Sequence, residues 1–286
     1  MAKKTSKFNF SPKIKLNTTP LIEAWLTVQW VLEPVQIGDP LFRDPFFAFA
    51  LGHFREGVKS RFSELEELEI AKFPAVELTA YKPHYRFRNS EGDGWPLLQL
   101  GPGTSTVNFT QEYTWEIFKD AALFMRKKLI EAYKETTLQT KALSLRYRNA
   151  VPCEYSSSNV LEYLSSKLNV SFGVPKYIPS KAAAVQRPDE INLNVVYKLL
   201  EPKGKGVLRI GTGTKKAEGQ VAGQDIGMEH IIFETEIIST DTDAPSINAQ
   251  LDFDNWLTAA HDIAHEWFFS LIDGPLCEHY KSGKED

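Results

Sequence analysis

The chain has 286 residues, of which 42% are hydrophobic and 24% charged, and its formal net charge is −4. This composition is typical of a globular protein with one large or two ordinary domains. It excludes an overall attraction to nucleic acid or anionic lipid, although a local basic patch stays compatible with it. No run approaches the roughly 18 apolar residues of a membrane span, and the basic start of the chain lacks the apolar core of a signal peptide. Two distant cysteines, Cys153 and Cys277, indicate free thiols, so we expect a cytoplasmic protein.

Residues 21–133 predict the order strand, helix, strand, strand, strand, long helix. Alternation of apolar and polar residues predicts the first strand, and apolar residues at helical spacing predict both helices. The predicted elements are a strand at 20–32, a helix at 46–65, extended segments at 76–88 and 97–109, and a helix from the N-cap Thr114 to residue 133. Gly101-Pro-Gly103 divides the second extended segment, and the acidic run 64–69 is interpreted as a solvated helix end or loop.

Residues 143–272 predict the same order again. The predicted elements are a strand at 143–151, a helix capped by serines 156–158 and ending at 168, strands at 191–200, 207–214 and 228–240, and a helix at 254–272. A long connection at 170–189, a turn at 203–206 and a polar hairpin loop at 215–227 join them.

The repeated order β-α-β-β-β-α predicts an α+β protein made by tandem duplication, with antiparallel strands and helices on one face of the sheet. The predicted division is an N-terminal arm at 1–19, a first repeat at 20–136, a second repeat at 137–275 and a C-terminal tail at 276–286. The element order is similar to that of the TATA-binding-protein-like saddles, which are also tandem repeats of a related unit. Two separately packed α+β lobes are the alternative.

Two histidines on the last predicted helix, His261 and His265, are four residues apart and therefore close on one helical face, as zinc ligands would be. The metalloprotease pattern needs Glu directly after the first His, where this chain has Asp262. The apolar arc of the helix includes His261 at its edge and ends just before His265. We therefore interpret them as boundary histidines that pack and hydrogen-bond beneath the sheet, and we predict no metal or other cofactor.

No catalytic constellation is recognisable in the sequence. Gly211-Thr-Gly-Thr-Lys215 and Gly101-Pro-Gly103 lack the spacing of a phosphate-binding loop and do not open helices, so both are interpreted as turns. The GxSxG nucleophile elbow is absent from the sequence. The sequence thus leaves enzymatic activity open, favours a non-catalytic protein and nominates no catalytic residue.

Two segments, Arg86-Phe-Arg-Asn89 and Arg146-Tyr-Arg-Asn149, share the pattern arginine, aromatic, arginine, asparagine. Strand alternation sends both arginines of each segment to one face. The predicted binding residues on this face are Arg86, Arg88, Asn108, Arg146, Arg148, Asn192, Asn194 and Arg209, with Lys198 and His84 nearby and Glu77, Glu234 and Glu236 opposing them. Arginine on a rigid sheet suits recognition of carboxylate or phosphate, but arginine is also common on any solvent-facing sheet surface.

Several segments that together span nearly the whole chain carry a resemblance to a known family. They are PLIEA at 20–24, LQLGP at 98–102 with Val107-Asn108, Trp115, YRN at 147–149, and 261–268 followed by Ile272. On these segments the chain resembles a sporadically distributed family of prokaryotic proteins with no established activity. The patchy distribution implies an accessory role, like that of phage-defence or toxin–antitoxin loci.

Three functions remain open from the sequence. The first is a non-catalytic protein whose Arg-rich sheet face or inter-repeat groove binds a protein partner encoded nearby. The second is a nucleic-acid-binding module on the same face, which the net charge and the facing glutamates disfavour. The third is a metal-dependent hydrolase centred on His261 and His265. No membrane partner is expected.

Overall fold

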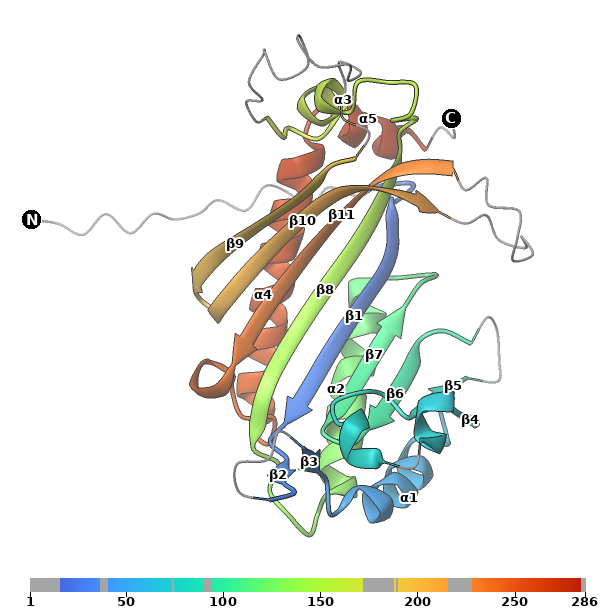
Figure 1. The fold of residues 1–286 in the computed structure, drawn as a ribbon, viewed down its shortest axis with the longest axis vertical. Coiled ribbons are helices and arrows are strands. Elements are labelled where there is room, and N and C mark those ends of the chain that lie inside the picture. Colours follow the sequence, from blue (N-terminus) through green and yellow to red (C-terminus); the bar gives the residue numbers. More distant parts are fainter. Residues whose placement is uncertain are drawn as a thin grey trace, which may run out of the picture.

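Nine strands of the described chain form one antiparallel sheet in an α+β fold (Figure 1). The structure is a computed structural model that describes residues 16–36, 41–73, 75–89, 94–171, 188, 190–215 and 228–283. The strands of the sheet are β1 (Leu21–Trp30), β4 (Glu64–Glu67), β5 (Tyr85–Arg88), β6 (Leu97–Gly101), β7 (Thr104–Phe109), β8 (Thr140–Pro152), β9 (Asn192–Leu200), β10 (Lys203–Lys215) and β11 (Met228–Thr240). Two short strands, β2 (Glu33–Pro34) and β3 (Phe42–Arg43), pair separately with each other.

The strand order across the sheet is β4-β5-β6-β7-β1-β8-β11-β10-β9. The strands β1 and β8 lie side by side at the centre, with Leu26 opposite Leu145. On the far side of β1 come β7, β6 and β5, and on the far side of β8 come β11, β10 and β9. The predicted alternation of β1 is confirmed, because Ala24, Leu26 and Val28 are buried on one side of the strand while the residues between them are only partly buried.

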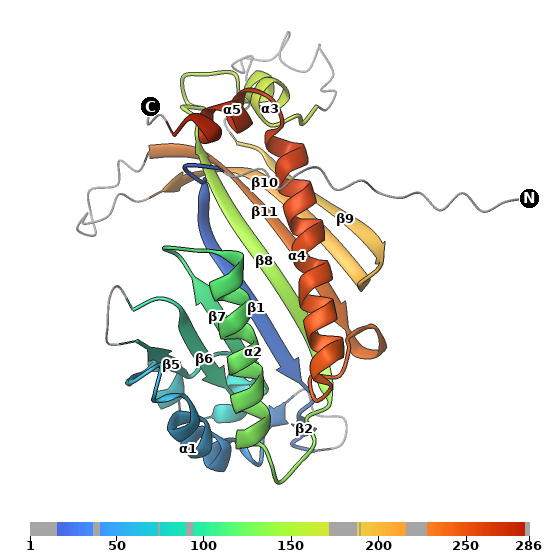
Figure 2. The ribbon, with the colours of Figure 1, turned by 180° about the vertical axis from the view of Figure 1, so that it is seen from behind.

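The α-helices of the described chain lie on one side of the sheet or at its ends (Figure 2). They are α1 (Phe47–Val58), α2 (Trp115–Ala132), α3 (Val160–Lys167), α4 (Gln250–Ile272) and α5 (Pro275–Ser282). The two long helices lie along the sheet, with α2 against β7 and α1, and α4 against β8 and β11. None of these α-helices lies over the opposite side of the central strands, which we call the open face (Figure 1).

In the described part of the chain, two apolar cores hold the α-helices on the sheet. The main core joins strands β1, β6, β7 and β8 to α1, α2 and α4, so it combines residues from before and after residue 137. A second core lies where α3, α5 and the end of α4 meet β8, β10 and β11. It contains the free cysteines Cys153 and Cys277. Burial, together with the nearby carboxylate of Glu229, raises the pKa of the Cys153 thiol to about 11, which disfavours the reactive thiolate.

Several local predictions are confirmed. Helix α2 begins after Thr114, whose side chain accepts a hydrogen bond from the backbone N–H of Ile117, as expected of an N-cap. The turn at Gly101-Pro-Gly103 joins β6 and β7 into a hairpin, and β11 has the predicted bounds.

Other local predictions in the first half are wrong. Helix α1 ends at Val58, because Phe62 turns into the main core and residues 64–67 form the edge strand β4. Residues 64–67 of the acidic run therefore form a strand that pairs with β5, and Glu69 begins a short 3₁₀ helix, Glu69–Lys72. The predicted extended segment at 76–88 begins instead with a short 3₁₀ helix, Val76–Thr79.

The second half also departs from prediction in places. Residues 203–206 form the start of β10 instead of a turn. Gly204 allows β10 to approach β11 closely here, since a Cβ atom at this position would lie 2.1 Å from the carbonyl oxygen of Ile238. Asn159, and not the preceding serines, caps α3. Helix α4 begins at Gln250, four residues early, and α5 was not predicted. Most of the predicted connection at 170–189 and of the loop at 215–227 lies outside the described residues.

Candidate functional site

Strand alternation places the predicted arginines on the open face. In β8, Leu143 and Leu145 are buried against the helices, whereas Arg146 and Arg148 stand on the other side. The same alternation holds in β5, where Phe87 is buried between Arg86 and Arg88. The predicted direction of all four arginine side chains is therefore confirmed.

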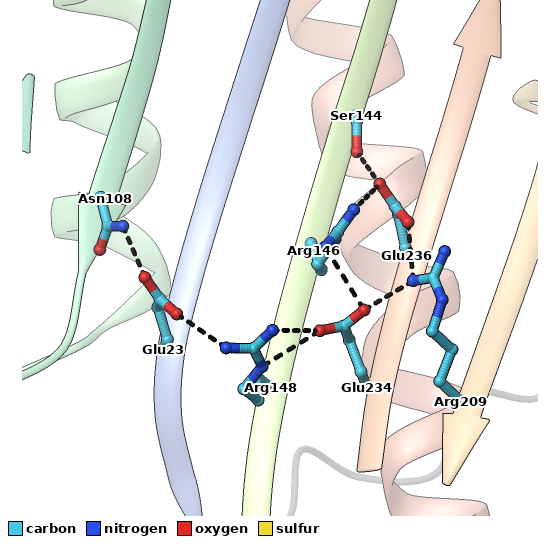
Figure 3. Close-up of polar contacts among 8 residues, drawn as sticks. All are labelled: Glu23, Asn108, Ser144, Arg146, Arg148, Arg209, Glu234 and Glu236. Carbon is cyan, nitrogen blue, oxygen red and sulfur yellow. Dashed lines mark hydrogen bonds and ion pairs between the residues drawn. The ribbon is translucent and has the colours of Figure 1, made fainter. Parts of the chain in front are cut away.

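The arginines of β8 and β10 bind two glutamates of β11 (Figure 3). Hydrogen bonds run from Arg146 to Glu236 (2.7 Å), from Arg209 to Glu236 (2.9 Å) and Glu234 (2.6 Å), and from Arg148 to Glu234 (3.0 and 3.1 Å). We call these five residues the central ion-pair cluster. The register explains them, because Glu236 lies opposite Arg146, and Glu234 lies opposite both Arg148 and Arg209.

The two glutamates of the cluster are buried, with side chains that are 7% exposed for Glu234 and 5% for Glu236. Burial acts to raise the pKa of Glu236, but hydrogen bonds from Ser144, Arg146 and Arg209 outweigh it and hold that pKa below its ordinary value. For Arg209, burial acts to lower the pKa, and its hydrogen bonds to the two glutamates raise it instead. Each of the three guanidinium groups is thus already bonded to a buried carboxylate of β11.

The two predicted arginines of β5, Arg86 and Arg88, are also paired with a glutamate. Arg86 bonds to Glu66 of β4 at 3.0 Å, and Arg88 lies 3.5 Å from the same carboxylate. These two arginines are grouped on the β4 side of the sheet, and the central ion-pair cluster lies on the β8, β11 and β10 side. The predicted binding residues therefore form two separate groups.

The remaining predicted residues are scattered. Asn192, Asn194 and Lys198 lie on the edge strand β9 and are exposed, with Asn194 opposite Arg209. His84 is buried, and its ring contacts that of Phe47 at the start of α1, with 5.8 Å between ring centroids. Glu77 belongs to the 3₁₀ helix and not to a strand. Neither His84 nor Glu77 faces the central ion-pair cluster, so their predicted places are wrong.

A pocket of about 270 Å³ opens on the open face beside Trp25. It lies over β1, β6 and β7 and is bordered by the segment that follows the 3₁₀ helix; the lining residues include Glu23, Trp25, Thr27, Tyr81, Gln99 and Asn108. The Nδ2 atom of Asn108 donates a hydrogen bond to Glu23 at 2.7 Å. Its Oδ1 atom is buried and has no hydrogen-bond partner in the described chain. Of the predicted residues, only Asn108 lines this pocket.

Sequence reasoning missed Glu23 and Trp25. The signal was present, because both alternate outward in a strand whose buried residues were correctly predicted. Their neighbours, however, come from β7 and β8, far away in the sequence: Trp25 lies opposite Asn108 on one side and Arg146 on the other. Only the strand order brings them together.

The histidines of α4 lie on the helical side of the sheet. His261 stacks on Trp115 of α2 with 3.8 Å between ring centroids, and its Nδ1 atom lies 2.9 Å from the hydroxyl of Tyr147. That hydroxyl lies 2.9 Å from the hydroxyl of Tyr113. His261 thus packs and hydrogen-bonds beneath the sheet, while His265 is exposed. Among the described residues, no group of three or more His, Cys, Asp or Glu could hold a metal ion.

Replacing Tyr147 by phenylalanine is expected to lower the free energy of unfolding by about 1–3 kcal/mol, because it removes a hydrogen-bond partner from both Tyr113 and His261 at a buried position. Burial raises the pKa of Tyr147, so this hydroxyl stays protonated. Urea denaturation measures the loss. The matched control is Tyr163→Phe, whose exposed hydroxyl bonds to the carbonyl of Pro152 and whose removal should change stability by no more than about 0.5 kcal/mol. Equal losses in both variants would contradict a structural role for the Tyr147 hydroxyl.

No protein-family model and no curated protein matches the chain. The resemblance carried by the sequence motifs therefore stays a prediction. None of the described helices combines the length and apolar character needed to cross a membrane.

Proposed function

We propose that this is a non-catalytic binding protein whose open face holds a protein partner. The observation that carries the proposal is the one-sided covering of the nine-stranded sheet, since the described helices leave the central strands open on the face that holds the pocket. Such a face is rigid and presents polar groups at fixed spacing. In keeping with the family resemblance, we expect a cytoplasmic protein from an accessory locus with the partner encoded nearby.

A protein partner fits this face better than nucleic acid. The guanidinium groups that would contact phosphates are already bonded to Glu66, Glu234 and Glu236, and little counterion release is left to drive binding. At the edge of the same face, Val196 and Leu200 of β9 are 54% and 84% exposed. Exposed apolar side chains beside paired charges are typical of a protein interface.

We also propose that the sheet arose by duplication of one β-α-β-β-β-α unit. The strand order supports this, because β7, β6 and β5 follow β1 outward in the same order as β11, β10 and β9 follow β8. The unit pairs α1 with α3 and α2 with α4. A saddle-shaped sheet would be the consequence, with the open face as its binding surface.

The test is co-purification from the native host with blocking variants. Thr27→Trp and Asn194→Trp each add a bulky side chain to the open face, and Glu266→Trp adds one to an exposed position on α4 as the matched control. We expect a specific protein to be recovered with the wild type and the control, and lost with at least one open-face variant. Unchanged recovery with both open-face variants would overturn the proposal, and so would recovery of nucleic acid in place of protein.

A further inference from the structure

We infer that the pocket beside Trp25 receives an arginine side chain of the protein partner. This inference rests on the proposed function and adds the chemistry of the group that is recognised. It depends on three properties of the pocket: a partly exposed carboxylate, a buried acceptor without a donor, and an aromatic wall.

The carboxylate is that of Glu23. The short hydrogen bonds of Arg146, Arg148 and Arg209 go to the two glutamates of β11, which leaves Glu23 with a longer ion pair. Among the described residues, the cation that pairs with Glu23 is Arg148, and its Nη1 atom lies 3.5 Å from Glu23 Oε2. The hydrogen bond to Glu23 comes from the neutral amide of Asn108. The Glu23 side chain is also 27% exposed, so its charge is open to a ligand.

The buried acceptor is Oδ1 of Asn108. A carbonyl oxygen that is removed from water without a donor costs free energy, so a bound group that donates a hydrogen bond there is favoured. Asn108 holds its orientation through the bond from Nδ2 to Glu23. Both residues line the pocket, so it offers an amide oxygen and a carboxylate, which call for a ligand group with several donors.

The aromatic wall is Trp25. Arg146 and Arg148 of β8 lie over this ring at 4.8 and 5.2 Å from its centroid, which shows that the ring already attracts guanidinium groups on the β8 side. The pocket lies on the β7 side of the same residue. A guanidinium group is planar, carries donors in a fixed fork and stacks on aromatic rings, so it matches a carboxylate, an amide oxygen and an indole together. The pocket volume suits one such side chain.

The test titrates the intact protein with N-acetyl-arginine methylamide at low salt and follows the indole N–H signal of Trp25 by NMR, assigned with Trp25→Phe. The neutral citrulline analogue and the lysine analogue are the ligand controls. We expect saturable binding of the arginine probe that is about tenfold or more tighter than that of either control, since only this probe combines a positive charge with the planar fork. Absence of saturable binding, or equal binding of a control ligand, would overturn the inference.

Variants locate the binding. Glu23→Gln keeps the acceptor for Asn108 and removes the charge, and it should weaken the arginine probe about tenfold. Thr27→Trp fills the pocket and should abolish binding, whereas Glu266→Ala on α4 should leave it unchanged. Equal affinity in wild type and Glu23→Gln would contradict the site. If the partner is lost with Thr27→Trp but the arginine probe does not bind, the pocket assignment fails and the proposed function stands.

Discussion

Replacing Arg146 by methionine is expected to lower the free energy of unfolding by about 3–5 kcal/mol, the usual cost of removing one partner from a buried ion pair. Arg146 donates a 2.7 Å hydrogen bond to Glu236 and lies 3.5 Å from Glu234, and both carboxylates are buried. Without Arg146, the buried carboxylate of Glu236 keeps only Arg209 as an ion-pair partner among the cluster residues. Glu234 keeps Arg148 and shares Arg209 with Glu236. Urea denaturation with an unchanged m-value would measure the loss.

The control for this prediction is an arginine–carboxylate pair on the protein surface. Asp120→Asn breaks the pair between Arg61 and Asp120, whose side chains are 38% and 67% exposed, and it should cost no more than about 1 kcal/mol. Adding Glu236→Gln to Arg146→Met should recover part of the loss, because it removes a buried negative charge whose remaining cation, Arg209, is shared with Glu234. A loss below about 1 kcal/mol in Arg146→Met would show that the central ion-pair cluster behaves like a surface pair.

The same cluster predicts how stability depends on pH. The pKa of Glu236 in the folded protein lies below its ordinary value of 4.5, so the folded state binds the proton less readily than the unfolded chain. The stability that this group contributes is therefore fully present above pH 4.5 and is lost as the pH falls through the folded pKa. In Arg146→Met, the pKa of Glu236 should rise toward 4.5, so less stability should be lost as the pH falls below 4.5. Unfolding curves over a pH series check the direction.

The elements that were predicted correctly are those whose structure depends on interactions between residues close in the sequence. The alternation of β1 and the cap at Thr114 depend on neighbours within a few residues, and both were right. The α+β class followed from their order. The edge strand β4 was not predicted because it is stabilised by a segment distant in the sequence. Its residue Glu66 lies opposite Arg86 of β5 and forms an ion pair with it. The high helix propensity of glutamate favoured a helix end at these residues instead of a strand.

The direction of the arginines could be predicted, but their partners could not. Alternation within β8 is a local property, whereas the position of Glu236 opposite Arg146 depends on strand order and register between segments about 90 residues apart. A one-residue shift in register would send the glutamates of β11 to the helical side. The pocket has the same origin, since β1, β6 and β7 meet there with the segment that follows the 3₁₀ helix. The candidate site is thus a product of the sheet topology.

The turn between β6 and β7 should be one of the least tolerant positions in the fold. A Cβ atom on Gly101 would lie 1.9 Å from the carbonyl oxygen of Lys82, a backbone atom that is held in place from both sides. Tyr81 donates its backbone N–H to Pro102, and His84 donates to Leu100. Gly101→Ala must therefore displace the chain near Lys82, and we expect a loss of about 1–3 kcal/mol from overpacking, and more if these hydrogen bonds break.

Gly52→Ala in α1 is the matched control, since nothing lies within 4 Å of the added methyl group. Replacing a helical glycine by alanine should raise the free energy of unfolding by up to about 1 kcal/mol. Opposite signs in thermal and urea unfolding are expected for the two variants, and a neutral Gly101→Ala would contradict the close approach. Because Tyr81 and Pro83 also border the pocket, Gly101→Ala should weaken binding of the arginine probe even where the protein stays folded. The turn that closes the β6–β7 hairpin would then set both the stability of the sheet edge and the shape of the pocket.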